Sequence, residues 1–173
     1  RMVLSMVFIS FGLYLSGGLF GRPIHGLIDS YLPPVIRSAQ TKDDDSKQGH
    51  LAWINDLQEG LTVANKVNKP IFIDFTGYTC TNCRWMEVNV FVDKEVQELF
   101  SNFVLVKLFT DGGPNHKEYQ KMEIERYGTS ALPFYVVLDS NEIEISRFHG
   151  MDTDVSKFIN FLQTSLNRYY DSI

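Results

Sequence analysis

Cysteine is scarce in this sequence of 173 residues: only Cys80 and Cys83 occur, and both lie within one short motif. A framework of several disulfides requires more cysteines, and a zinc site with four ligands would need further ligands beside this pair. The sequence therefore predicts neither a disulfide-stabilised small domain nor a structural metal site. The two thiols are left for chemistry.

Basic residues are also too few and too scattered to form a nucleic-acid-binding surface. Lysine and arginine number 16 against 21 acidic residues, the net charge is −5, and no basic block occurs. A nucleic-acid partner is therefore not expected. The sequence also lacks internal repeats. The Gly-Gly pair at 112–113 lacks the Lys-Ser/Thr that would complete a phosphate-binding loop.

The sequence does contain a long run without charge. Residues 2–21 carry no charged side chain and are bracketed by Arg1 and Arg22. At about 1.5 Å per residue, such a run spans roughly 30 Å as a helix, the thickness of a bilayer core. We therefore predict a transmembrane helix over residues 1–22, with residues 2–21 in the lipid bilayer. A secretory signal peptide or signal anchor and a soluble helix are the alternatives, although no A-x-A-like cleavage site follows the run.

Residues 23–50 are predicted to connect this helix to a folded domain. Apolar residues recur between 24 and 32 at the spacing of one helix face, and a Pro-Pro pair follows. Such a pattern suits a short helix on the membrane surface and equally a helix that caps a domain. Residues 38–49 are almost wholly polar and predict a solvated linker.

Residues 51–173 show the alternation of apolar strands and amphipathic helices that predicts an α/β domain. The central strand, Ile71–Phe75, is apolar except for Asp74, as expected for a strand buried on both faces. The predicted order is of parallel strands joined by helices, followed by an antiparallel hairpin, which makes a mixed sheet flanked by helices. Further strands are expected at 103–109, 134–138 and 143–148, and helices near 57–67, 81–90, 94–100, 116–127 and 155–162.

The motif Cys80-Thr81-Asn82-Cys83 lies where the central strand gives way to a helix. At a helix N-terminus, unpaired N–H groups and the macrodipole favour a thiolate and can lower a cysteine pKa from about 8.5 toward about 7. Cys80 is therefore the expected nucleophile. Cys83, one turn further in, is close enough to form a disulfide and is the expected resolving thiol. The alternative is a structural disulfide or a pair of idle thiols.

Two acidic residues accompany the cysteines. Asp74, if desolvated in its apolar strand, would have a raised pKa and could accept the proton that Cys83 must lose. An acid satisfied by the backbone or by water is the alternative. Glu87 is four residues after Cys83, on the same helix face, and could tune the thiol electrostatically. The alternative for Glu87 is an ordinary surface glutamate.

The stretch 71–87 resembles the thioredoxin family, and within it the C-terminal domain of DsbD-type transmembrane thiol:disulfide interchange proteins. The family's pattern of a strand acid followed by CxxC falls on Asp74, Cys80 and Cys83 without a gap. A further acid typical of the DsbD-type domain falls on Glu87. The resemblance implies a thioredoxin-like fold preceded by one transmembrane helix.

The resemblance also places a cis proline beside the CxxC motif, and Leu132-Pro133 fits that position. A cis bond there would expose a backbone edge on which an extended partner segment could pair. We expect Tyr78 and Phe134 to shape the rim of this substrate groove. The alternative is a plain proline at the start of a strand.

The active site departs from thioredoxin itself at Thr79, where Trp is usual, and at residues 81–82, which are Thr-Asn instead of Gly-Pro. The chemistry carries over from the family, whereas the reduction potential does not. Residues 17–34 are similar to the end of the membrane domain in DsbD-type proteins. The chain begins with Arg1 instead of methionine, which suggests a piece of a longer protein.

The function implied by the resemblance is that of a membrane-tethered protein-disulfide reductase. Its dithiol would receive electrons from a dithiol in a membrane domain and pass them to periplasmic disulfide-containing proteins, with the helix in the inner membrane. No cofactor is expected besides the redox-active Cys80–Cys83 disulfide. A stand-alone anchored thioredoxin that reduces apocytochromes or exported proteins is a second interpretation. From a different class, the two cysteines would serve a chaperone for a soft metal such as Cu(I). A redox-inactive interaction module is a further alternative, against which the intact motif argues.

Overall fold

The computed structural model describes residues 2–19 and 51–171. The first range forms one helix, α1 (Met2–Leu19), which contains no charged residue. None of the helices in the two described ranges meets the length and hydropathy that a membrane crossing requires. The predicted surface helix and linker of residues 23–50 lie outside the described residues. The division of the chain into residues 1–22, 23–50 and 51–173 therefore stays a prediction.

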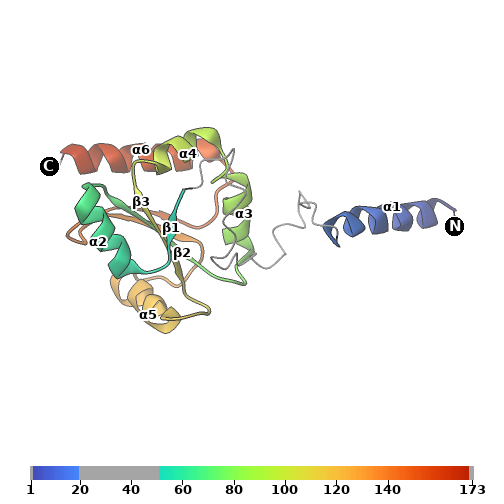
Figure 1. The fold of residues 1–173 in the computed structure, drawn as a ribbon, viewed down its shortest axis with the longest axis horizontal. Coiled ribbons are helices and arrows are strands. Elements are labelled where there is room, and N and C mark those ends of the chain that lie inside the picture. The colour runs from blue at the N-terminus through green and yellow to red at the C-terminus, as the bar shows by residue number, and fades with distance from the viewer. Residues whose placement is uncertain (1, 20–50, 172–173) are drawn as a thin grey trace. The chain divides into compact units, whose positions relative to one another are not determined.

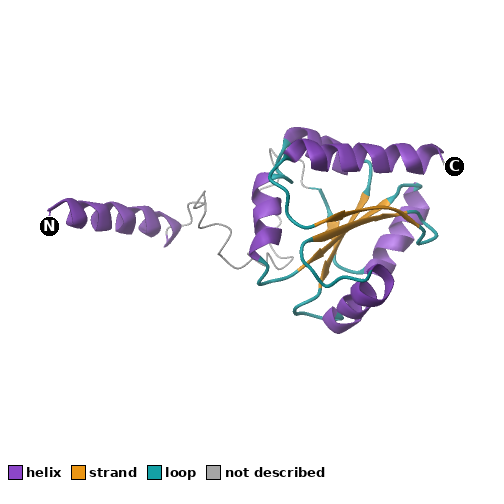
Figure 2. Ribbon diagram, turned by 180° about the vertical axis from the view of Figure 1, so that it is seen from behind, coloured by secondary structure: helices purple, strands orange, loops and turns teal. Residues whose placement is uncertain are grey.

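A five-stranded mixed sheet forms the centre of the second range (Figures 1 and 2). Its strands lie side by side in the order β1-β3-β2-β4-β5. β3 pairs in parallel with β1 and β2, whereas β4 is antiparallel to β2 and to β5. The predicted parallel strands and antiparallel hairpin are thereby confirmed. The strands are β1 (Trp53–Ile54), β2 (Ile71–Thr76), β3 (Val104–Phe109), β4 (Phe134–Leu138) and β5 (Glu144–His149).

Helices cover both faces of this sheet (Figure 2). One apolar cluster joins the sheet to α2 and α5, and a second joins it to α3, α4 and α6. The sheet therefore lies between two helical layers. The helices are α2 (Leu57–Val67), α3 (Thr81–Asn89), α4 (Lys94–Phe100), α5 (His116–Tyr127) and α6 (Val155–Asp171).

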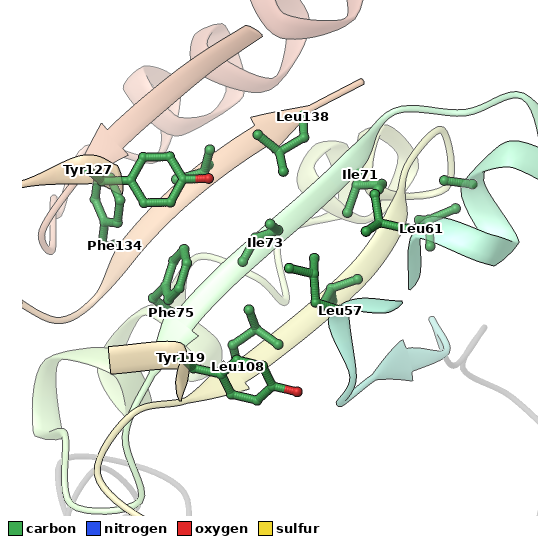
Figure 3. Close-up of a cluster of buried hydrophobic side chains, with 14 residues drawn as sticks. Leu57, Leu61, Ile71, Ile73, Phe75, Leu108, Tyr119, Tyr127, Phe134 and Leu138 are labelled. Atoms are coloured by element: carbon green, nitrogen blue, oxygen red, sulfur yellow. The ribbon is translucent and has the colours of Figure 1, made fainter. Parts of the chain in front are cut away.

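Side chains of β2 alternate between the two clusters. Ile71, Ile73 and Phe75 belong to the cluster beneath α2 and α5 (Figure 3), and Phe72 belongs to the other. All six residues of the strand are buried, which explains its almost continuous apolar sequence. Because successive side chains of a strand point to opposite faces, Asp74 shares the face of Phe72, which α3 covers.

The capping residues set the helix boundaries as predicted. Asp93 caps α4 by accepting a hydrogen bond from the backbone N–H of Glu95 at 2.9 Å. Gly128 ends α5 in the left-handed conformation, with φ of 72°, where a glycine meets no steric penalty. The strand β1 was not predicted, because two residues are too short to show a strand's alternation. β5 begins at Glu144, one residue later than expected.

We expect residues 51–173 to fold without the preceding segment. All described residues of both apolar clusters follow position 50, and about 120 residues suffice for an independent core. The fragment should give an α/β circular dichroism spectrum and a single cooperative urea transition. A fragment that unfolds without a cooperative transition would contradict the expectation.

Candidate active site

The junction between β2 and α3 holds the two cysteines. A turn over residues 77–79 leads to Cys80, which is the N-cap of α3, and Cys83 lies in the first turn of that helix. A disulfide joins them, with an S–S distance of 2.11 Å and a Cα–Cα distance of 5.3 Å. The structure thus shows the oxidised form of the pair.

The two sulfurs differ in their access to solvent. Cys80 is partly exposed, whereas Cys83 is 1% exposed. The Sγ atom of Cys80 accepts a hydrogen bond from the backbone N–H of Cys83 at 3.2 Å. Such an N–H at a helix N-terminus stabilises a thiolate more than a thiol. After reduction, Cys80 is therefore the sulfur placed to attack an incoming disulfide, and Cys83 is placed to attack Cys80.

Asp74 is a buried acid in the strand that leads to the cysteines. Its side chain is 1% exposed, and Oδ1 has no hydrogen-bond partner among the described residues. Burial raises the pKa of Asp74 from 3.8 to about 7, with Lys107 lowering it and Glu87 raising it by smaller amounts. A carboxyl with this pKa can take and release a proton near neutral pH, as a general base must.

Glu87 is a member of a partly buried charge cluster and not an ordinary surface residue. It forms an ion pair with Arg84 of α3 and a second with Lys107 of β3, where Nζ lies 2.6 Å from Oε1. Lys107 in turn lies opposite Asp74 in the parallel register of β2 and β3. Its Nζ is also 4.8 Å from the ring centroid of Trp53. Glu87 thus contributes to the raised pKa of Asp74, and its action on the thiol stays a prediction.

Lys107 is a site residue that the sequence analysis missed. The sequence does mark Lys107, because it is the single charged residue in an otherwise apolar strand. Its significance depends on the register of β3 against β2, which a single sequence does not reveal.

Asp111, in the loop between β3 and α5, holds the turn before Cys80. Its Oδ1 accepts a hydrogen bond from the N–H of Tyr78 at 2.7 Å, and its Oδ2 accepts two from Thr79, from N–H and Oγ1, both at 2.9 Å. Partial burial alone would raise the pKa of Asp111, but these hydrogen bonds together hold it below its usual value. Gly77 permits the approach, because a Cβ there would lie 2.8 Å from Oδ2. From the sequence alone, this aspartate is only part of a predicted loop.

Replacing Asp111 by alanine should loosen the turn that carries Cys80. The change leaves two backbone N–H groups and one hydroxyl without their acceptor, so we expect a loss of about 1–2 kcal/mol in the free energy of unfolding. Because the pKa of Asp111 is depressed in the fold, its contribution is present above the ordinary carboxyl pKa and is lost as the pH falls through the folded value. Urea titrations of both proteins at pH 7 and pH 2.5 would test this. Equal stability at pH 7 would show that Asp111 does not hold the turn.

The peptide bond between Leu132 and Pro133 is cis, as the resemblance predicted. Leu132 also lies beside the active-site turn, since a Cβ built on Gly77 would be 3.2 Å from its Cδ1. The structure therefore brings the segment before β4 next to the turn that carries Cys80, although the two are more than 50 positions apart in the sequence.

Tyr78 and Phe134, both expected at the rim of a substrate groove, lie in different surroundings. Tyr78 is partly exposed, and its ring stacks on Phe109 at 4.1 Å. Phe134 is fully buried and packs against Phe75 and Tyr127, with ring centroids 5.8 and 5.5 Å apart (Figure 3). The expectation for Phe134 is therefore wrong, because its side chain points from β4 into the core and has no surface to offer a substrate.

No set of three or more His, Cys, Asp or Glu side chains in residues 2–19 and 51–171 is arranged to hold a metal ion. Within that part of the chain, a soft-metal function would thus have to rely on the two thiols.

Comparisons with known proteins agree with this site. Residues 52–140 match the family described as thioredoxin-like. The thiol:disulfide interchange protein DsbD of Campylobacter jejuni (strain RM1221) is 24% identical over 119 residues, which are 69% of this chain and 20% of that protein. DsbD of Haemophilus influenzae (strain 86-028NP) is 31% identical over 106 residues, 59% of this chain and 17% of that protein. The chain thus spans about a fifth of the length of the curated relatives it matches.

Solved structures show the same fold. A thioredoxin from Thermus thermophilus superimposes with a TM-score of 0.56 at 22% identity, over 67% of this chain and 87% of that one. The oxidised C-terminal domain of Neisseria meningitidis DsbD gives 0.52 at 20% identity, over 66% of this chain and 99% of that one. With the match over residues 52–140 and the CxxC pair at the start of α3, these findings show that the chain belongs to the thioredoxin-like family and carries the site of a thiol–disulfide oxidoreductase.

Proposed function

We propose that this chain is the reductase end of a membrane-tethered electron relay. Its dithiol receives two electrons from a dithiol in a membrane domain and passes them to disulfide-containing proteins of the periplasm. The similarity to the thiol:disulfide interchange protein DsbD of two organisms supports disulfide exchange with partner proteins. The charge-free run at residues 2–21 supports the tether, as do the exposed apolar side chains of Met6 and Phe8, since large exposed apolar surfaces mark interaction with a membrane or another protein.

The observation that carries the proposal is the asymmetry of the site. The thiolate of Cys80, at the exposed end, attacks one sulfur of the partner's disulfide, and the other partner sulfur leaves as a thiolate. Cys83 then gives its proton to Asp74, and its thiolate attacks the sulfur of Cys80. The sulfur of the partner that was bound to Cys80 then leaves as a thiolate. Two electrons have thereby passed from the dithiol of Cys80 and Cys83 to the partner, and the Cys80–Cys83 disulfide of the structure remains.

In this proposal, the partner chain binds beside Leu132, the residue before the cis proline. Leu132 borders the turn that carries Cys80, so an extended partner segment lying along residues 131–132 would present its disulfide to the exposed sulfur. Tyr78 lies on the same turn and forms a second border.

A reduction potential tests the proposed direction. Equilibration of the full chain with glutathione or dithiothreitol redox buffers should give a potential well below the −120 mV or so of the oxidant DsbA. The reduced chain should also accelerate the reduction of insulin disulfides. A potential near that of DsbA, or no acceleration, would rule out a reductase.

A further inference from the structure

A cavity of about 560 Å³ lies beside the active-site turn and next to the edge strand β1. The segment of Leu132 leads instead into β4, on the other side of β2 in the sheet. The proposed exchange reaction does not use the cavity. Three parts of the chain line it: β1 with the start of α2, the residue Tyr78, and the end of β3 with the following loop and Tyr119. Its volume is that of a site for a side chain or small ligand.

Aromatic rings form part of its wall. The ring of Tyr78 stacks on that of Phe109 at an angle of 12°, and Gly112 and Gly113 approach it so closely that a Cβ on either would lie 3.1 Å from its atoms. The hydroxyl of Tyr119 donates to Oδ2 of Asp56 at 3.3 Å. The rings of Tyr78 and Tyr119 are thus fixed by contacts with the rest of the domain, and the cavity is present without a bound partner.

The charge of the lining is negative. Asp56 and Glu59 line the cavity, and none of its lining residues is a lysine, arginine or histidine. Asp56 caps α2 through the N–H of Glu59, and Glu59 is exposed and takes part in none of the ion pairs formed within the described ranges. The N-terminus of α2 contributes roughly +0.5 charge, which offsets only part of the two carboxylates. Two carboxylates in a lining without a basic side chain favour a cation.

We propose that this cavity binds an arginine or lysine side chain of the disulfide partner, close to the partner's reacting cysteine. The inference rests on the proposed function, since it requires a protein disulfide as substrate. Tyr78 is two residues before Cys80, so the Cα atoms of this wall residue and of the attacking cysteine lie within about 7 Å of each other. An extended partner segment advances about 3.3 Å per residue, so a basic residue two or three positions from the partner's cysteine reaches the cavity. Electrostatic complementarity of this kind selects partners and speeds encounter.

The test uses two disulfide-containing peptides that differ in one residue, arginine or glutamate, three positions from the attacked cysteine. The full chain is reduced with dithiothreitol, freed of it, and mixed with each peptide at low salt. Wild type should reduce the arginine peptide about fivefold faster, because the lining carboxylates attract the arginine and repel the glutamate. Glu59→Lys should bring this ratio close to one and leave the reduction of uncharged hydroxyethyl disulfide unchanged.

Glu98→Lys is the matched control, because it makes the same change in net charge on an exposed residue of α4 that does not line the cavity. This variant should keep the wild-type ratio. Equal rates for the two peptides with wild type, or an equal loss of the ratio in Glu98→Lys and Glu59→Lys, would overturn the inference while leaving the reductase in place. A wild-type chain that reduces neither the peptides nor hydroxyethyl disulfide would overturn the proposed function and the inference with it.

Discussion

Replacing Cys83 by serine should turn the domain from a turnover catalyst into a covalent trap for its partner. Cys80 keeps its position at the N-terminus of α3, so its attack on a disulfide is unaffected. A serine hydroxyl is too weak a nucleophile at neutral pH to release the mixed disulfide. Turnover should fall by roughly a thousandfold or more, as it does when other enzymes lose a catalytic nucleophile, and the mixed disulfide should accumulate.

Cys80→Ser should have a different result, because the remaining thiol is 1% exposed in the structure. This variant should lose turnover and also capture nothing, and the double variant should behave in the same way. A non-reducing gel of each purified variant, with the captured species released by dithiothreitol, distinguishes the three. Equal capture by both single variants would show that Cys80 is not the sole attacking thiol and would contradict the assignment. Comparable losses of Cu(I) binding in both, with no capture in either, would favour the soft-metal chaperone instead.

Asp74→Asn should stabilise the oxidised domain at pH 8. In the unfolded chain this carboxyl loses its proton near 3.8, but in the fold it does so at about 7. Between these values the folded state holds a proton that the unfolded state lacks, so the free energy of unfolding falls as the pH rises from about 4 to about 7. Three pKa units correspond to about 4 kcal/mol. Since a buried amide also needs hydrogen bonds, we expect a gain of about 2–4 kcal/mol at pH 8.

Urea unfolding of wild type and variant at pH 4 and pH 8 measures this gain, which should nearly vanish at pH 4. Asp171→Asn, at an exposed position at the end of α6, should show no such dependence on pH. A gain of the same size at both pH values would show that Asp74 does not carry the expected proton.

The same substitution should slow the release of the partner more than its capture, because asparagine cannot accept the proton of Cys83. In wild type the rate of release should rise as the pH passes through about 7, the pKa of Asp74, and this rise should be lost in the variant. Stopped-flow reduction of a model disulfide separates the two steps. An unchanged rate of release would leave Asp74 as a structural acid only.

Glu123→Gln is the control for this kinetic effect. Glu123 is a second fully buried acid, and burial raises its pKa to about 7 as well. It lies on α5, which packs on the other face of the sheet from α3. The substitution should therefore raise stability at pH 8 as Asp74→Asn does, without altering the release step.

The features that the sequence determined are those that depend on neighbouring residues. The apolar run of β2, the CxxC pair at the start of a helix, and the caps at Asp93 and Gly128 all use contacts within a few positions, so the order of residues shows them directly. Asp74 was recognised for the same reason, because one acid in an apolar strand must be buried when the strand is.

Tertiary structure alone decided which distant residues complete the site and which do not. Lys107 meets Asp74 and Glu87 only through the register of two strands, and Asp111 reaches Tyr78 across 33 positions. Phe134 shows the opposite case, since its nearness to the proline in the sequence suggested a surface role, whereas its direction from β4 buries it. Pairing between strands and the closing of loops depend on the packing of the whole domain, and a single sequence records the residues but not the pairs.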